Sequence, residues 1–115
     1  MEAGETPAQA AIREVREETG LDVQLTGLLC VDVVKAQDGF SESIHFLFSA
    51  RTRQQDQPLH ADGVEVLQVR FMDTEAALTL LPGGTARRVS EALSASVGYY
   101  EGGQLALPFT TGYLP

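Results

Sequence analysis

The segment from Thr6 to Gly20 constrains the fold most, because it specifies one helix with a defined start and a defined end. Thr6 is a suitable N-cap, Pro7 suits the first helical position, and Gln9 completes a capping-box pattern. Gly20 is suited to the left-handed conformation in which many helices end. We therefore predict a helix from Pro7 to Thr19.

This helix gathers like charges near its C-terminal end. Glu14, Glu17 and Glu18 fall on one sector of a helical wheel, away from the apolar face of Ala8, Ala11, Ile12, Val15 and Thr19. Each like-charged pair costs about 0.2–0.5 kcal/mol, and glutamates in the last turn also oppose the helix dipole. On spacing alone, a solvated acidic face is the favoured interpretation. A site for a hard divalent cation such as Mg²⁺ is the alternative.

The rest of the chain alternates between strand and helix signals. Apolar alternation and turn residues predict a strand interrupted near Gly27 within 22–36, further strands at 41–51 and 64–72, helices at 74–81 and 85–97, and an irregular tail at 98–115. The length suits a single domain spanning residues 1–115. The expected fold class is α+β, with helices packed on a mixed sheet.

Composition excludes several kinds of partner. The chain of 115 residues carries a net charge of −8 at pH 7, which disfavours nucleic acid and anionic membrane surfaces as partners. Cys30 is the one cysteine, so no internal disulfide can form, and its apolar surroundings predict a buried thiol. Without a signal peptide or a long apolar run, the cytoplasm is the expected location.

The residues of the acidic helix resemble the signature of the Nudix hydrolases. That signature is a Gly, five residues, a Glu, seven residues, and then Arg-Glu-apolar-x-Glu-Glu-x-Gly-apolar. Glu5 matches the first Glu, TPAQAAI fills the seven positions, and REVREETGL matches the remainder from Arg13 to Leu21. The resemblance covers roughly residues 2 to 97, with its specific part between residues 5 and 21.

The resemblance implies an enzyme that hydrolyses a nucleoside diphosphate linked to another moiety, using Mg²⁺ or Mn²⁺. By matching position, Glu14, Glu17 and Glu18 resemble metal ligands, and Glu14 also resembles a residue that activates the attacking water. Arg13 resembles a residue that orients a neighbouring carboxylate. Glu65 occupies a position where some members place another carboxylate, although a solvated strand residue is the favoured interpretation there. The implied architecture is an α/β/α sandwich with helices on both faces of the sheet.

The sequence departs from the family pattern at its start. The family places glycines and several strands ahead of this point, whereas here Met1 occupies the usual Val position. We expect either a misassigned start, in which an internal GTG codon was read as initiation, or a true truncation stabilised by a partner or a homodimer. A truncated chain predicts a second class of function: a fragment or pseudoenzyme that binds metal or a partner without catalysis.

Overall fold

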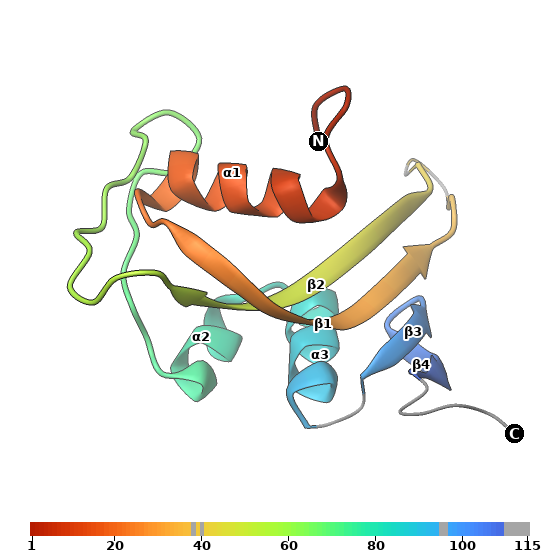
Figure 1. Ribbon diagram of the computed structural model, residues 1–115. Coiled ribbons are helices and arrows are strands. Elements are labelled where there is room, and N and C mark those ends of the chain that lie inside the picture. Colours follow the sequence, from red (N-terminus) through yellow and green to blue (C-terminus); the bar gives the residue numbers. More distant parts are fainter. Residues whose placement is uncertain (38, 40, 95–96, 110–115) are drawn as a thin grey trace, which may run out of the picture. The chain divides into compact units, whose positions relative to one another are not determined.

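The structure is a computed structural model that describes residues 1–37, 39, 41–94 and 97–109. Its helices and strands follow in the order α1 (Pro7–Thr19), β1 (Val23–Val34), β2 (Ser43–Thr52), α2 (Thr74–Leu80), α3 (Gly83–Leu93), β3 (Gly98–Glu101) and β4 (Gln104–Pro108), as Figure 1 shows. The helices predicted at 7–19 and 74–81 and the strand predicted at 41–51 are confirmed, with small shifts at their ends. The helix predicted at 85–97 forms but runs from Gly83 to Leu93, and residues 95–96 lie outside the described part of the chain.

The strands form one mixed sheet in the order β2-β1-β3-β4. β1 and β3 are parallel, and their register runs from Cys30 opposite Gly98 to Val33 opposite Glu101. β3 and β4 are antiparallel. The predicted α+β class with a mixed sheet is therefore confirmed, whereas the placement of helices on both faces stays a prediction.

The chain divides into two compact units, each described here by itself. The first comprises Met1–Gly27 and Ser49–Met72, and the second comprises Leu28–Phe48 and Asp73–Pro115. The prediction of a single domain over residues 1–115 stays a prediction. No helix within the described part of the chain is long and apolar enough to cross a membrane.

Helix α1 has the caps that its sequence predicts. The Thr6 hydroxyl accepts a hydrogen bond from the Gln9 backbone N–H at 3.1 Å, and the Gln9 side chain accepts one from the Thr6 N–H at 3.0 Å. Gly20 ends the helix with φ 80°, and its N–H donates to the Arg16 carbonyl. These reciprocal bonds satisfy backbone groups that a helix end leaves unpaired.

The loop after β2 holds the C-terminal end of α1. The His60 N–H donates to the Thr19 carbonyl at 2.7 Å. A Cβ added at Gly20 would lie 3.2 Å from the His60 nitrogen, so a larger residue would push this loop away. The Gln57 side chain bonds both backbone groups of Asp22, at 2.7 Å and 3.1 Å. These contacts fix the helix turn that carries the glutamates.

β1 and β2 run antiparallel within the first unit. Hydrogen bonds join three pairs whose numbers rise in one strand as they fall in the other: Asp22 with Arg53, Gln24 with Arg51, and Thr26 with Ser49. β1 continues through Gly27 without a break. The expected interruption at Gly27 is therefore wrong, because the neighbouring strand keeps this glycine in extended conformation.

The strand predicted at 64–72 does not form in the structure. The Asp62 carboxylate accepts hydrogen bonds from the backbone N–H groups of Val64 and Val66, at 2.9 Å and 2.8 Å. These bonds lower the pKa of Asp62, with the Val66 N–H as the largest cause. A local turn has therefore taken N–H groups that a strand ladder would use, and Val64, Leu67 and Phe71 are largely exposed.

The tail predicted to be irregular instead forms a hairpin of β3 and β4, so this prediction is wrong for residues 98–108. The turn residues Gly102 and Gly103 both have positive φ, 59° and 82°. Two such residues make the turn type that matches the twist of paired strands. Residues 110–115 lie outside the described part of the chain.

Gly98 lets the two hairpin strands approach closely. An added Cβ would collide with the Leu107 carbonyl oxygen and would lie 2.8 Å from Leu105 Cδ1 and 2.9 Å from Pro108 Cα. The chain also has φ 159° at Gly98, at the limit of the region that glycine alone adopts easily. Only glycine fits this position without moving β4.

The core of the second unit is small and includes one carboxylate. Cys30, Tyr100 and Asp32 are fully buried, and Ala92 of α3 is 1% exposed. Burial raises the pKa of the Cys30 thiol, as expected for an inert structural cysteine. Leu93, the last residue of the same helix, is 52% exposed.

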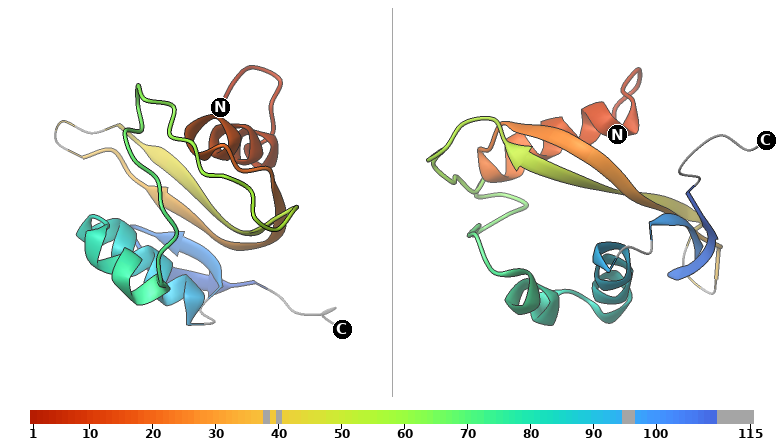
Figure 2. Two further views of the ribbon diagram at one scale, coloured as in Figure 1. Left: turned by 90° about the vertical axis from the view of Figure 1, so that its left-hand side faces the viewer. Right: turned by 60° about the horizontal axis from the view of Figure 1, so that its bottom comes forward.

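Asp32 joins three elements of the second unit. Its carboxylate accepts a hydrogen bond from Arg88 Nε of α3 at 2.6 Å and another from the Gly103 N–H of the hairpin turn at 3.1 Å. The Arg87 guanidinium donates to the Gly102 carbonyl at 3.1 Å. The views in Figure 2 show α3 beside this hairpin. A buried charge on β1 therefore holds both neighbours in place.

Candidate metal site on helix α1

Arg13 is the centre of the polar groups on α1. Its guanidinium donates two hydrogen bonds to the Glu5 carboxylate, from Nε at 2.7 Å and from Nη2 at 3.1 Å. The side chains are 26% and 17% exposed. The Glu2 N–H donates to the same carboxylate at 2.7 Å. This fork-shaped pair ties the segment before α1 to the second turn of the helix.

The Arg13 guanidinium lowers the pKa of Glu5 to about 2, and the hydrogen bond from the Glu2 backbone adds to the shift. The pKa of Arg13 is raised in turn, chiefly by the hydrogen bond to Glu5. Both groups therefore stay charged across the physiological pH range.

We expect the pKa of Glu5 to rise toward its ordinary value of about 4.5 in the Arg13→Gln variant. A folded-state pKa below the unfolded one stabilises the protein above pH 4.5, and this contribution is lost as the pH falls toward 2. Carboxyl-detected NMR titration measures the change. Arg16→Gln removes the same charge from the same helix and should leave Glu5 unaltered. An unchanged Glu5 titration in Arg13→Gln would contradict the assignment.

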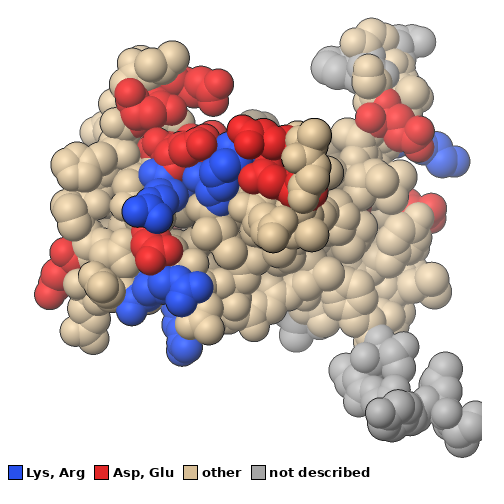
Figure 3. Space-filling view, turned by 45° about the horizontal axis from the view of Figure 1, so that its top comes forward, with Lys and Arg blue, Asp and Glu red and all other residues tan. Residues whose placement is uncertain are grey.

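Two of the three clustered glutamates lie around the same guanidinium. Arg13 Nη1 donates to Glu17 Oε2 at 3.0 Å, and Nη2 lies 3.6 Å from Glu14 Oε1. The Met1 ammonium lies 3.8 Å from the same Glu14 oxygen. The space-filling view of Figure 3 shows acidic and basic groups interleaved on this side of the molecule. Cations therefore already compensate part of the repulsion between the carboxylates.

The structure does not bring the other predicted residues into this cluster. Glu18 is half-buried, and Glu65 is exposed in the turn after Asp62. In the described part of the chain, neither side chain forms a hydrogen bond or ion pair with Arg13, Glu14 or Glu17. Nor do the described residues contain a group of three His, Cys, Asp or Glu side chains placed to hold a metal ion.

The chemistry of the donors nevertheless fits Mg²⁺ or Mn²⁺. Glu14 and Glu17 offer hard carboxylate oxygens one helix turn apart, and these side chains are 48% and 59% exposed. Mg²⁺ commonly takes one or two protein carboxylates and completes its shell with water and phosphate oxygens. Exposed glutamates can adopt new rotamers at small cost, so the residues fit the ion although their side chains are not yet gathered around one point.

Sequence reasoning assigned Glu5 no contact, although it has the strongest hydrogen bonds to Arg13. Eight positions separate the two residues, so helical periodicity cannot pair them: Glu5 precedes the helix. The family motif was the one available signal for this contact, because it contains both Glu5 and Arg13 at a fixed spacing. Only the path of the chain ahead of Thr6 shows that they meet.

Comparisons with known proteins agree with the motif. A family model described as NUDIX domain matches residues 1–93, which include α1 with its caps, β1, β2, α2 and α3. A comparison with curated proteins found no match. Because the family match covers most of the 115 residues, the chain belongs to the Nudix family of hydrolases.

Proposed function

We propose that this chain hydrolyses the pyrophosphate bond of a nucleoside diphosphate linked to another moiety, through attack of water assisted by a divalent metal ion. The observation that carries the proposal is the clustering of Glu14 and Glu17 around Arg13. These residues belong to REVREETGL, the part of the family motif from Arg13 to Leu21, on a well-capped helix.

Glu14, Glu17 and Glu18 would hold Mg²⁺ or Mn²⁺. A bound metal supplies charge neutralisation of the pyrophosphate and a lowered pKa of bound water. Arg13 would act as a positioning residue, because its hydrogen bonds to Glu5 and Glu17 tie the loop and the helix together. Glu14, which is half exposed and beside this guanidinium, would accept a proton from the attacking water.

The charge of the chain supports a substrate that arrives with a metal ion. At a net charge of −8, the protein repels free polyphosphate, and a divalent cation reverses that repulsion locally. We propose a small-molecule substrate of this kind, with no nucleic-acid or membrane partner, and the cytoplasm as the location. Glu65 is exposed in the turn after Asp62, so it remains a secondary candidate.

The proposal is tested by incubating the chain with a panel of nucleoside diphosphate derivatives and measuring the products by chromatography. We expect cleavage with Mg²⁺ or Mn²⁺ and none with EDTA, because the carboxylates alone cannot neutralise the pyrophosphate. Circular dichroism in EDTA checks that the fold is retained. If the folded chain cleaves no member of the panel with either metal, the proposal is wrong and a non-catalytic fragment or pseudoenzyme is the favoured alternative.

A further inference from the structure

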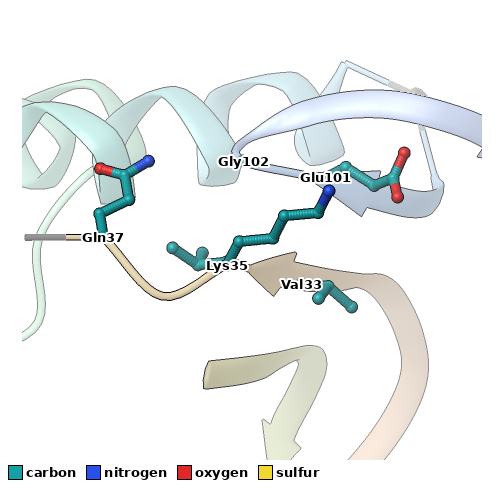
Figure 4. Close-up of a pocket in the computed structure, with 6 residues that line it drawn as sticks. Val33, Lys35, Gln37, Glu101 and Gly102 are labelled. Carbon is teal, nitrogen blue, oxygen red and sulfur yellow. The ribbon is translucent and has the colours of Figure 1, made fainter. Parts of the chain in front are cut away.

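A pocket of about 230 Å³ lies in the second unit and contains none of the α1 carboxylates. Figure 4 shows this pocket, which is lined by Val33, Val34, Lys35, Gln37, Glu101 and Gly102. The lining comes from the end of β1, the residues that follow it, and the β3-β4 turn. The Gly102 N–H donates to the Val33 carbonyl at 3.0 Å, which joins the two sides of the pocket.

The position of the pocket in the sheet favours a binding role. β1 and β3 are parallel neighbours, with Val33 opposite Glu101 at the last pair of their register. The pocket is therefore at the carboxyl ends of two parallel strands. Ligands of open sheets with parallel strands commonly bind at that edge. This observation is independent of the size of the cavity.

The two charged residues of the pocket have opposite signs. In Figure 4 the Lys35 side chain is extended toward the turn that carries Glu101 and Gly102. The Tyr99 hydroxyl donates to Glu101 Oε2 at 3.1 Å, which restrains this carboxylate. Within the described part of the chain, Lys35 and Glu101 do not approach within the 4.0 Å of an ion pair. A ligand can therefore meet one positive and one negative group at the same time.

The size of the pocket limits the ligand to a small molecule. A cavity of about 150 Å³ accommodates benzene, and pockets for drug-sized molecules begin at about 300 Å³. The present volume lies between these values. Val33, which alternates with Lys35 along the chain and pairs with Glu101, adds apolar surface on their side of the sheet, so a ligand with an aliphatic part as well as charges fits the pocket.

We propose that this pocket binds a small zwitterion of the amino-acid type. Its carboxylate would contact the Lys35 ammonium, its ammonium group would contact the Glu101 carboxylate, and its aliphatic side chain would lie on Val33. A plain anion fits less well, because Glu101 repels it, and a plain cation is repelled by Lys35. The charge pair thus selects a molecule that carries both signs.

Lys35 is the only lysine of the chain, which gives a direct probe of the pocket. Reductive methylation with ¹³C-formaldehyde labels its amine and the Met1 amine, and it retains their positive charge. We expect titration with L-leucine to shift the Lys35 signal with a dissociation constant of about 1 mM, typical of a small open site. The Met1 signal should not move, and it serves as the internal control.

Matched ligands and variants separate the proposed mode from simple anion binding. N-acetyl-L-leucine lacks the ammonium group and L-leucinamide lacks the carboxylate, and each should bind at least about tenfold more weakly, the effect of one lost charge contact. Glu101→Gln should weaken L-leucine binding by a similar factor, whereas Glu75→Gln, an exposed change on α2, should not. Equal binding of N-acetyl-L-leucine, or no saturable shift of the Lys35 signal at about ten times the expected constant, would overturn the proposal.

Discussion

Glu17→Gln is expected to lower pyrophosphate hydrolysis about 100-fold or more. A metal ion stabilises the transition state of phosphoryl chemistry by several kcal/mol, and each 1.36 kcal/mol corresponds to a factor of about ten in rate. The substitution removes one negative ligand while keeping the size of the side chain. The rate with a substrate found in the nucleotide panel, measured at saturating and limiting Mg²⁺, gives the effect on turnover and on metal affinity separately.

The controls for this variant are Glu2 and Arg13, which belong to the same group of charged side chains. Glu2 lies 3.8 Å from Arg13 Nη1 and is exposed, so Glu2→Gln changes the local charge equally without removing a proposed ligand. Its turnover should stay within about twofold, as expected for a surface change. Arg13→Gln should reduce the rate less than Glu17→Gln, since Arg13 acts through its neighbours. Full activity of folded Glu17→Gln would disprove the assigned metal site.

Asp32→Leu is expected to lower the free energy of unfolding by about 3–5 kcal/mol, the usual cost of removing one partner of a buried ion pair. The substitution leaves the Arg88 guanidinium and the Gly103 N–H without their acceptor. All three tyrosines lie between residues 99 and 113, and the chain has no tryptophan. Urea unfolding followed by tyrosine fluorescence therefore reports on the C-terminal segment that this carboxylate holds.

A double variant identifies the cause of that loss. In Asp32→Leu/Arg88→Met neither charge is buried, so we expect recovery of a large part of the stability, because apolar replacements of buried ion pairs are often nearly neutral. Arg87→Met removes the exposed neighbouring arginine and should cost about 0.5 kcal/mol or less. If the double variant is no more stable than Asp32→Leu, the cost comes from repacking and not from an unpaired charge.

Local signals of the sequence predicted the helices and much of the sheet. The caps of α1 depend on Thr6, Gln9 and Gly20, whose capping hydrogen bonds stay within their own turns, so sequence spacing was sufficient. The strand expected at 64–72 does not form, and the cause is again a local hydrogen bond between a side chain and the backbone. Asp62 competes for the backbone through a short side chain, and the apolar alternation after it gave no sign of that competition.

The contacts that sequence reasoning could not predict join residues far apart in the chain. Asp32 appeared as one polar residue in an apolar run, and its partner Arg88 is 56 positions later. The motif identified Arg13, Glu14, Glu17 and Glu18 as a group. It could not show that Arg13 bonds most strongly to Glu5, nor that Glu18 and Glu65 make no hydrogen bond or ion pair with Arg13 in the described part of the chain, because rotamers depend on the surrounding structure.

The close approach of β4 to Gly98 has a consequence for variation among descendants of this gene. In a library that covers every substitution, variants at Gly98 should be depleted almost as completely as variants at Glu17. Gly98 nevertheless has no charged, hydrogen-bonding or nucleophilic side chain to lose. The two positions should differ under a selection for the amount of folded protein alone. Gly98 variants should be lost there as well, whereas Glu17→Gln should persist. Comparing a selection for activity with a selection for abundance therefore separates two kinds of residue. Some residues are retained for their chemistry, and others are retained because a larger side chain would leave no room for the neighbouring strand.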